Sequence, residues 1–186
     1  MGSTSNWPPS PSEKQLYFLA TKVVAPRCQG LIERPRLLDV TAQLSGKQLA
    51  VLKAPAGSGK TSLAATWLER IRQSGHAVAW LTIDPDDDEP ATFLFYIAHA
   101  LQRAYDGVGA AAINLIQESF LINPRAIVST LINDLAEIDD DVYLFLGDYH
   151  WVTNPDVHEA LAFFLKRAPS HCHFVLTDRH LSRGIA

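Results

Sequence analysis

The sequence contains little cysteine, little charge and no long apolar run. Cys28 and Cys172 are the only cysteines among 186 residues, and no Cys-x-x-Cys pair exists that would favour a zinc site. The apolar runs fall well short of the roughly 18 residues that a membrane-spanning helix needs. The N-terminus also lacks the charged-then-apolar order of a secretory signal peptide. These absences favour a cytoplasmic protein in a reducing compartment.

Charged residues make up 19% of the chain, and the formal net charge is −4. A protein that reads nucleic acid usually carries a basic patch, so the acidic balance argues against direct DNA contact by this chain. Apolar residues make up 47%, which is normal for a globular protein and excludes disorder over most of the chain. The low charge suggests a surface that further protein covers.

Composition divides the chain into a leader and one domain. Residues 1–15 are rich in Ser and Pro, which predicts a disordered leader. Residues 16–186 have the length of a single domain that buries its own core without disulfides or metal. We expect this domain to be the N-terminal fragment of a larger protein.

Short apolar segments alternate with helical patterns along this domain. The strand candidates span residues 49–53, 77–83, 141–146 and 172–177, and apolar positions at helical spacing lie between them. This alternation predicts a three-layer α/β fold in which helices flank a parallel sheet. Such cores usually carry a further strand, and none follows Thr177. We therefore expect the fold to be truncated after its fourth core strand.

A glycine-rich segment, APAGSGKT, joins the first strand candidate to the next helix. Gly59, Lys60 and Thr61 match the phosphate-binding pattern G-x-x-x-x-G-K-[ST], while Ala54 occupies the first glycine position. The alternative is a glycine-rich turn with a chance Lys-Thr pair. The strand–loop–helix context favours the phosphate-binding interpretation, because the helix N-terminus adds a partial positive charge at the loop.

The residues of this loop have distinct expected roles. Backbone amides freed by Gly57 and Gly59 would turn inward around phosphate oxygens. Lys60 would bridge the β- and γ-phosphates of a nucleotide, and Thr61 would ligate Mg²⁺. The predicted cofactors are therefore ATP or ADP with Mg²⁺. The predicted nucleotide contacts in this loop are Ala56, Gly57, Ser58, Gly59, Lys60, Thr61 and Ser62.

An acid follows the third strand candidate, in the segment GDYH. In nucleotide-hydrolysing sites one such acid holds Mg²⁺ and a second often polarises the attacking water. Asp148 could fill either role, or it could simply cap a turn. His150 is a candidate to sense the γ-phosphate or orient water, and equally a structural hydrogen-bonding residue. Arg179, after the fourth strand candidate, is a candidate γ-phosphate sensor, with an exposed loop arginine as the alternative.

An acidic run, DPDDDE, packs five acids into residues 84–89. A calcium-binding loop would need Gly at position 89 and Glu at position 95, but the chain has Glu89 and Phe95 there. Acids just before a helix are favoured by the helix dipole, and Pro90 suits the first turn. We interpret the run as the start of a helix.

Seven segments of the sequence, in their order along the chain, resemble one protein family. They resemble the N-terminal ATPase domain of the large ATP-binding LuxR-type transcription regulators, the MalT-like group of signal-transducing (STAND-class) P-loop ATPases. The matching stretches cover nearly everything between Thr21 and Arg179, which is far more specific than the phosphate loop alone. They read TKVVAPR, LIERPRLL, APAGSGKTSLAATWL, AWLTIDPDDDEPATFLFYIAHAL, LINDLAEI, GDYHWVTNPDVHEALAFFL and VLTDR.

The resemblance implies a nucleotide-dependent switch. Such proteins rest with ADP bound, exchange it for ATP when an inducer binds a distant sensor domain, and hydrolyse ATP slowly. Their ATP form self-associates and activates transcription through a C-terminal helix-turn-helix. The implied partners are nucleotide, the parent's remaining domains and a second copy in the ATP state, with DNA reached only through the C-terminal domain and no membrane. By this likeness Lys60 and Thr61 hold phosphate and Mg²⁺, Ile32 and Arg34 line the nucleotide, and Arg179 is the arginine sensor.

One departure from the family pattern concerns Gly147. The family usually reads DDYH where this chain reads GDYH, so the first, metal-ligating acid is replaced by glycine. We therefore expect a weak ATPase at most, with Asp148, His150 and Arg179 as catalytic candidates and Thr61 and Asp148 as Mg²⁺ ligands. Two alternatives stay open, a degenerate nucleotide-binding scaffold without turnover and a stand-alone P-loop NTPase or kinase.

Overall fold

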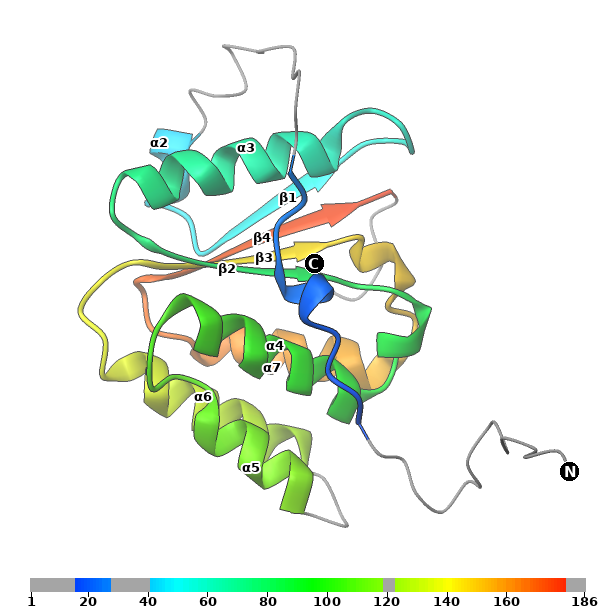
Figure 1. Ribbon diagram of the computed structural model, residues 1–186, viewed down its shortest axis with the longest axis vertical. Coiled ribbons are helices and arrows are strands. Elements are labelled where there is room, and N and C mark those ends of the chain that lie inside the picture. Colours follow the sequence, from blue (N-terminus) through cyan, green and yellow to red (C-terminus); the bar gives the residue numbers. More distant parts are fainter. Residues whose placement is uncertain (1–15, 28–40, 119–122, 180–186) are drawn as a thin grey trace, which may run out of the picture.

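The computed structural model describes residues 16–27, 41–118 and 123–179 (Figure 1). The leader predicted at residues 1–15 and the nucleotide-lining candidates Ile32 and Arg34 lie outside the described residues. No helix in the described ranges is long and apolar enough to cross a membrane.

The described strands form one parallel sheet of four strands in the order β1-β4-β3-β2. Their bounds are β1 (Leu49–Lys53), β2 (Ala77–Thr82), β3 (Val142–Gly147) and β4 (Cys172–Asp178). The central strands β3 and β4 are buried along their whole length, whereas β1 at one edge is half-exposed. The predicted parallel sheet is confirmed, although β3 and β4 each run one residue further than the sequence indicated.

Helices cover both faces of this sheet, which confirms the predicted three layers (Figure 1). The first face carries α2 (Thr41–Leu44) and α3 (Lys60–Gln73). The second face carries α4 (Pro90–Ala104) and α7 (Pro155–Arg167), with α5 (Ala110–Glu118) and α6 (Pro124–Ala136) farther from the sheet. Short 3-10 turns are η1 (Ala20–Val23), η2 (Pro85–Asp87) and η3 (Tyr149–Trp151).

Each face of the sheet has its own apolar cluster. Under α3, the buried side chains include Trp67, Trp80 and Phe145, with the last two rings stacked at 6.0 Å between centroids. On the other face a larger cluster joins α4, α6 and α7 to the sheet, with Phe93 and Phe174 among its fully buried members. The continuous apolar strands of the sequence are explained by this burial on both faces.

Local sequence signals fix where the helices begin. The side chains of Glu89, Asn123 and Asn154 each accept a hydrogen bond from a first-turn N–H of the following helix, and each is followed by proline. A capping side chain satisfies a donor that has no partner inside the helix, and proline suits the first position because its missing N–H is not needed there.

The N-terminal segment, residues 16–27, runs along α4 and crosses to the edge of β2 (Figure 1). The Tyr96 hydroxyl donates to the Tyr17 carbonyl at 2.9 Å and accepts from the Leu19 N–H at 3.3 Å. Phe18 stacks on His99 with 4.1 Å between ring centroids. These contacts tie a segment without regular strand or α-helix to the body of the domain.

Candidate functional site

The carboxyl ends of the parallel strands bring the predicted site residues to one edge of the sheet. β1 ends in the phosphate loop, β3 ends before Asp148 and β4 ends before Arg179. Lys53 lies in register with Asp178, and the Ala54 N–H donates to the Asp178 carbonyl at 3.3 Å. The phosphate loop therefore begins directly beside the end of β4.

The phosphate loop, residues 54–61, closes around the ammonium group of Lys60. Its Nζ donates to the carbonyls of Ala54 at 2.5 Å and Pro55 at 2.8 Å, and the Ser58 hydroxyl also donates to Pro55 at 2.8 Å. The loop leads into the N-terminus of α3, where first-turn N–H groups point out of the helix. Backbone donors and the positive end of the helix dipole thus meet at the loop, as an anion requires, while the Lys60 ammonium is held by the loop's own carbonyls.

Two glycines give this loop its shape. Gly57 and Gly59 have φ of +75° and +83°, a left-handed conformation that residues with a Cβ adopt only at a cost. A Cβ built at either position would meet nothing within 4 Å. Glycine is therefore needed here for backbone conformation, not for lack of space.

Asp148 lies just beyond β3 in an unusual conformation. Its φ of +57° makes it the one residue other than glycine with positive φ among those that the structure describes. Its N–H donates to the Thr177 hydroxyl at 2.9 Å, which ties it to the end of β4. Aspartate tolerates the left-handed region better than most residues, and such strain is typical of functional sites.

His150 is the point at which the charged groups of the site meet. Burial lowers its pKa below the usual histidine value, and the nearby cations of Arg179 and Lys60 lower it further. The carboxylates of Asp148 and Asp178 oppose this shift without cancelling it. Within the described residues neither ring nitrogen has a hydrogen-bond partner, and the side chain is 12% exposed. A neutral, unsatisfied imidazole therefore lies among four charges.

The Nδ1 atom of His150 lies 3.9 Å from an Asp148 carboxylate oxygen, and Arg179 and Lys60 are near enough to lower the pKa of the imidazole. Thr61 and Ser62 form the first turn of α3 directly after Lys60 and are partly buried. Arg179 is exposed, and its guanidinium lies 6.0 Å from the centre of the Trp151 ring. Its position beside His150 comes from the last residues of β4.

Sequence reasoning missed Asp178, the second acid at this edge. It is the last residue of β4 and is 4% exposed. The apolar pattern predicted that the strand ends at Thr177, and only Arg179 was singled out beyond it. The available signal was the pattern itself, an apolar strand that ends in Thr-Asp, which is the same arrangement that singled out Asp148 after β3.

Gly147 lies against an aromatic ring. A Cβ at this position would lie 3.2 Å from the side chain of Trp80 and 3.4 Å from the Leu81 carbonyl. The Trp80 indole is held in place by donating its N–H to the Thr82 hydroxyl at 2.7 Å. A side chain at position 147 would therefore require the Trp80 ring to shift by a few tenths of an ångström.

The donor set at this edge suits Mg²⁺ better than a softer metal. In the described part of the chain no group of three His, Cys, Asp or Glu side chains is arranged to hold a metal. Mg²⁺ prefers oxygen ligands and usually keeps several waters, with one or two carboxylates and the phosphates of its nucleotide completing the shell. The Thr61 hydroxyl and the Asp148 carboxylate fit that limited contribution, and Asp178 adds a further carboxylate nearby.

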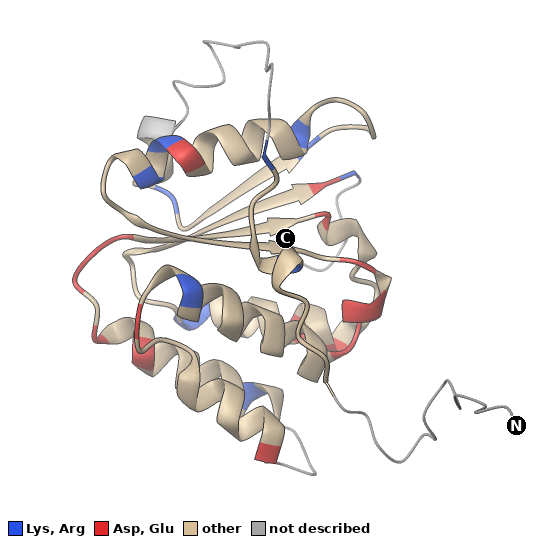
Figure 2. Ribbon diagram, viewed as in Figure 1, with Lys and Arg blue, Asp and Glu red and all other residues tan. Residues whose placement is uncertain are grey.

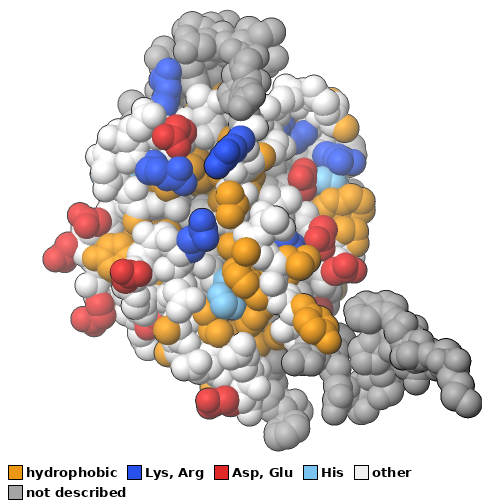
Figure 3. Space-filling view, viewed as in Figure 1, with side chains coloured by type: hydrophobic (Ala, Val, Ile, Leu, Met, Phe, Trp, Pro, Cys, Tyr) orange, Lys and Arg blue, Asp and Glu red, His pale blue; other side chains and the backbone are white. Residues whose placement is uncertain are grey.

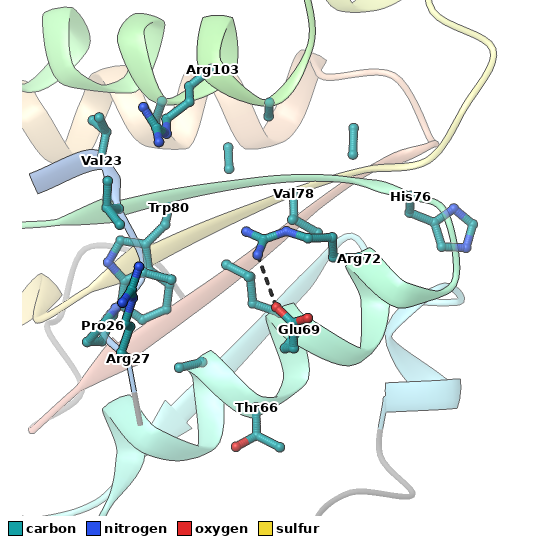
Figure 4. Close-up of a pocket in the computed structure, with 18 residues that line it drawn as sticks. Val23, Pro26, Arg27, Thr66, Glu69, Arg72, His76, Val78, Trp80 and Arg103 are labelled. Atoms are coloured by element: carbon teal, nitrogen blue, oxygen red, sulfur yellow. Dashed lines mark hydrogen bonds and ion pairs between the residues drawn. The ribbon is translucent and has the colours of Figure 1, made fainter. Parts of the chain in front are cut away.

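A separate cavity of about 870 Å³ lies between the N-terminal segment, α3, β2 and the end of α4 (Figure 4). Three arginines, Arg27, Arg72 and Arg103, line it together with apolar side chains such as Trp80, and Arg72 pairs with Glu69 at 3.0 Å. On the face in Figure 3, several Lys and Arg side chains gather over α3 with one acidic side chain among them, while most other Asp and Glu lie toward the left and right margins. No residue of the phosphate loop lines this cavity.

A family model described as Nephrocystin 3, N-terminal, matches residues 27–179. The chain belongs to this family. The matched range of the Nephrocystin 3 N-terminal family includes the phosphate loop, the end of β3 and the end of β4. All the site residues described above therefore lie inside it.

Curated relatives confirm the predicted resemblance to MalT-like regulators. The HTH-type transcriptional regulator MalT of Vibrio parahaemolyticus is 32% identical over 163 residues, covering 87% of this chain and 18% of MalT. The serine/threonine-protein kinase PknK of Mycobacterium tuberculosis is 30% identical over 171 residues, covering 92% of this chain and 15% of PknK. The chain spans less than a fifth of the length of these relatives.

Solved structures share the fold at low sequence identity. The crystal structure of Cdc6p from Pyrobaculum aerophilum matches with a TM-score of 0.55 and 16% identity, over 84% of this chain and 41% of that one. A chain of Drosophila ORC bound to AT-rich DNA and Cdc6 matches with a TM-score of 0.50 and 12% identity, over 78% and 48%. At these identities the likeness is one of fold, and the predicted P-loop NTPase fold is confirmed.

Proposed function

We propose that this chain is the ATP- and ADP-binding switch domain of a larger cytoplasmic transcription regulator. The observation that carries the proposal is the phosphate loop, shaped by Gly57 and Gly59 around Lys60, beside the charged strand ends of a P-loop fold. Similarity to MalT over 87% of the chain supports the regulatory context. In this proposal residues 16–186 form the nucleotide-binding domain, and DNA contact belongs to a separate C-terminal domain.

The phosphate loop supplies most of the binding energy in this proposal. Its amides and the first turn of α3 hold the phosphates, and Lys60 exchanges its carbonyl contacts with Ala54 and Pro55 for phosphate oxygens. Thr61 and Asp148 hold Mg²⁺, which neutralises phosphate charge when bound. Ile32 and Arg34 are proposed to line the rest of the nucleotide.

The strand ends distinguish ATP from ADP in this proposal. His150 has a lowered pKa because it is buried and because the cations of Arg179 and Lys60 lie nearby. A γ-phosphate next to it would offset those cations and would give the unsatisfied ring nitrogens a partner. The ATP form would then favour self-association and transcription activation by the whole protein, while ADP would favour the resting form.

A nucleotide-binding scaffold without turnover is the second candidate. Gly147 favours it, because the usual metal-side acid is absent and Trp80 packs tightly against this position. Binding through the phosphate loop is unaffected in this alternative. Slow release of phosphate from ATP by the purified chain would distinguish the switch ATPase from the scaffold.

Calorimetric titration with ADP and ATP, with and without Mg²⁺, tests nucleotide binding directly. We expect the wild-type chain to bind both nucleotides and Lys60→Ala to bind each about 10- to 100-fold more weakly, because charge-assisted hydrogen bonds to phosphate are lost. Lys47→Ala is the matched control, since Lys47 is exposed at the opposite end of β1. Binding that Lys60→Ala leaves unchanged would overturn the proposal.

A further inference from the structure

The acidic turn, residues 84–89, does more than start a helix. Glu89 accepts from the Thr92 N–H and so caps α4, and Asp84 accepts from the Asp86 N–H within η2. For these two acids the interpretation from the sequence agrees with the structure. Asp87 also accepts from the Asp84 N–H at 2.9 Å, but Asp87 and Asp88 make long-range contacts in addition, which the sequence did not indicate. Figure 2 shows the turn as an acidic stretch at the right of the molecule.

Asp87 fixes the turn to the N-terminal segment. Its side chain is fully buried, and both carboxylate oxygens accept from the Lys22 ammonium at 2.5 Å. Lys22 also lies 2.9 Å from an Asp84 oxygen and 4.4 Å from the centre of the Tyr96 ring. A buried pair with these surroundings costs several kcal/mol to break, so the turn has a fixed position relative to α4.

Asp88 extends from the same turn in the other direction. Its Oδ1 accepts from the N–H groups of Thr153 at 2.9 Å and Asn154 at 2.8 Å, and its Oδ2 accepts from the Thr153 hydroxyl. The Asn154 amide donates back to the Asp88 carbonyl at 3.3 Å. Partial burial pushes the pKa of Asp88 up, but these hydrogen bonds outweigh burial and hold the pKa below its usual value.

Thr153 and Asn154 directly follow the loop that carries the strand-end site. This loop, residues 148–152, begins at Asp148, which the Thr177 hydroxyl holds, and contains His150. Internal hydrogen bonds from Trp151 N–H to the Asp148 carbonyl at 3.1 Å and from Val152 N–H to the Tyr149 carbonyl at 2.9 Å keep it compact. A shift at residue 153 is therefore transmitted to His150 through only two intervening residues.

We propose that Asp88 is a positioning residue of the nucleotide site, because it fixes the end of the loop that presents Asp148 and His150. Asp88 acts through Thr153 and Asn154 and touches no nucleotide itself. The proposal rests on the proposed function, since it assigns Asp88 to the half of the site that meets Mg²⁺ and the γ-phosphate. The phosphate loop, which Asp88 does not contact, binds the remaining phosphates independently.

The expected effect of removing the Asp88 carboxylate on nucleotide affinity follows from the preorganisation of the loop. Apparent affinity falls in proportion to the fraction of molecules in which the binding arrangement is populated. Without the Asp88 carboxylate the loop samples further arrangements, and we expect its binding-competent fraction to fall to about one tenth. Binding of MgATP should then weaken about tenfold, whereas binding of ADP without Mg²⁺ should stay within about twofold of wild type.

Calorimetry on the full 186-residue chain tests this split between ligands. Asp88→Ala is compared with wild type and with Asp86→Ala, a matched control in which an exposed acid of the same turn is removed. Thr153→Val removes only the hydroxyl contact and should weaken MgATP binding by a smaller factor, while Thr153→Ser should restore wild-type binding. These milder variants report on the loop even if Asp88→Ala folds poorly.

The outcomes separate this proposal from the one it rests on. A wild-type chain that binds neither nucleotide overturns the proposed function and, with it, the role of Asp88. A wild-type chain that binds both, with Asp88→Ala weakening both equally or neither, overturns only the positioning role. Loss confined to MgATP, absent from Asp86→Ala and restored by Thr153→Ser, supports it.

Discussion

The phosphate loop and the loop after β3 are built in opposite ways. The phosphate loop closes on itself, because Lys60 binds the carbonyls of Ala54 and Pro55 only a few positions earlier. The loop after β3 is held from outside, by Thr177 at its start and Asp88 at its end. The phosphate loop is therefore the local half of this site, held by contacts between neighbouring residues. The loop after β3 is the tertiary half, held by residues distant in the sequence. Changes far along the chain should therefore affect the second half and spare the first.

The largest expected effect comes from the buried ion pair that supports the tertiary half. Lys22→Met leaves the fully buried Asp87 without its partner, and we expect it to lower the free energy of unfolding by about 3–5 kcal/mol. Urea denaturation measures this change. Glu159→Ala is the control, since it breaks the exposed Arg125–Glu159 pair and should cost under about 1 kcal/mol. Equal losses in the two variants would contradict the prediction.

A smaller loss of stability is expected from a substitution at Gly147, which precedes the loop of the tertiary half. Gly147→Asp places a side chain against Trp80, and overpacking of this kind costs about 1–3 kcal/mol. We therefore expect the variant to lower the unfolding midpoint and not to raise ATP hydrolysis. In a double-mutant cycle Gly147→Asp should cost less in a Trp80→Leu background than in the wild type, because leucine makes room beside residue 147. A single Gly147→Asp variant that is fully stable and hydrolyses ATP rapidly would show that the indole yields easily.

Nucleotide binding by the phosphate loop, the local half, should respond to a change in backbone conformation alone. Gly59→Ala forces a Cβ onto a residue with φ of +83°, which costs about 1–2 kcal/mol, and it should weaken binding of ADP with or without Mg²⁺. Gly46→Ala is the control, because Gly46 has ordinary φ and its Cβ would meet only the Gln43 carbonyl at 3.7 Å. If both variants bind ADP like wild type, the glycine conformation is not what shapes the loop.

The smallest expected effect is a dependence of stability on pH. Burial lowers the pKa of both His99 and His150 in the folded chain. As pH falls below their unfolded value of 6.5, the unfolded chain takes up protons first, so stability declines toward acid pH. Thermal unfolding between pH 7.5 and pH 5.5, roughly spanning the histidine range, should show this decline. The double variant His99→Gln, His150→Gln should show a flatter profile, and an unchanged slope would contradict the assignment.

The features that could be predicted from the sequence are those that depend on local contacts, and the tertiary contacts could not be predicted. The alternation of strands and helices and the phosphate loop were predictable, because each depends on residues close together in the chain. Lys60 and Gly59 were therefore placed correctly in a strand–loop–helix unit. The contacts of Asp87 with Lys22 and of Asp88 with Thr153 join residues that are 65 positions apart, and no local pattern encodes such pairings.

The acidic turn also shows that the residues of one sequence pattern can have several structural roles. Charge before a proline and an apolar helix correctly indicated the start of α4 at Pro90. It could not indicate that Asp87 would be fully buried, because burial depends on where the N-terminal segment lies. Asp178 was missed for a simpler reason, since the end of β4 was set one residue too early.

The half-exposed strand β1 has a consequence for how the protein behaves at high concentration. In the sheet formed by the described residues it is an edge strand whose Val51 is 44% exposed, and an exposed apolar edge strand is a template for aggregation. The strand is only five residues long, and exposed lysines, Lys47 and Lys53, stand near its start and at its end. Short length and flanking positive charge are the usual safeguards of such an edge. The same lysines that look incidental to nucleotide chemistry therefore stand where such safeguards are expected.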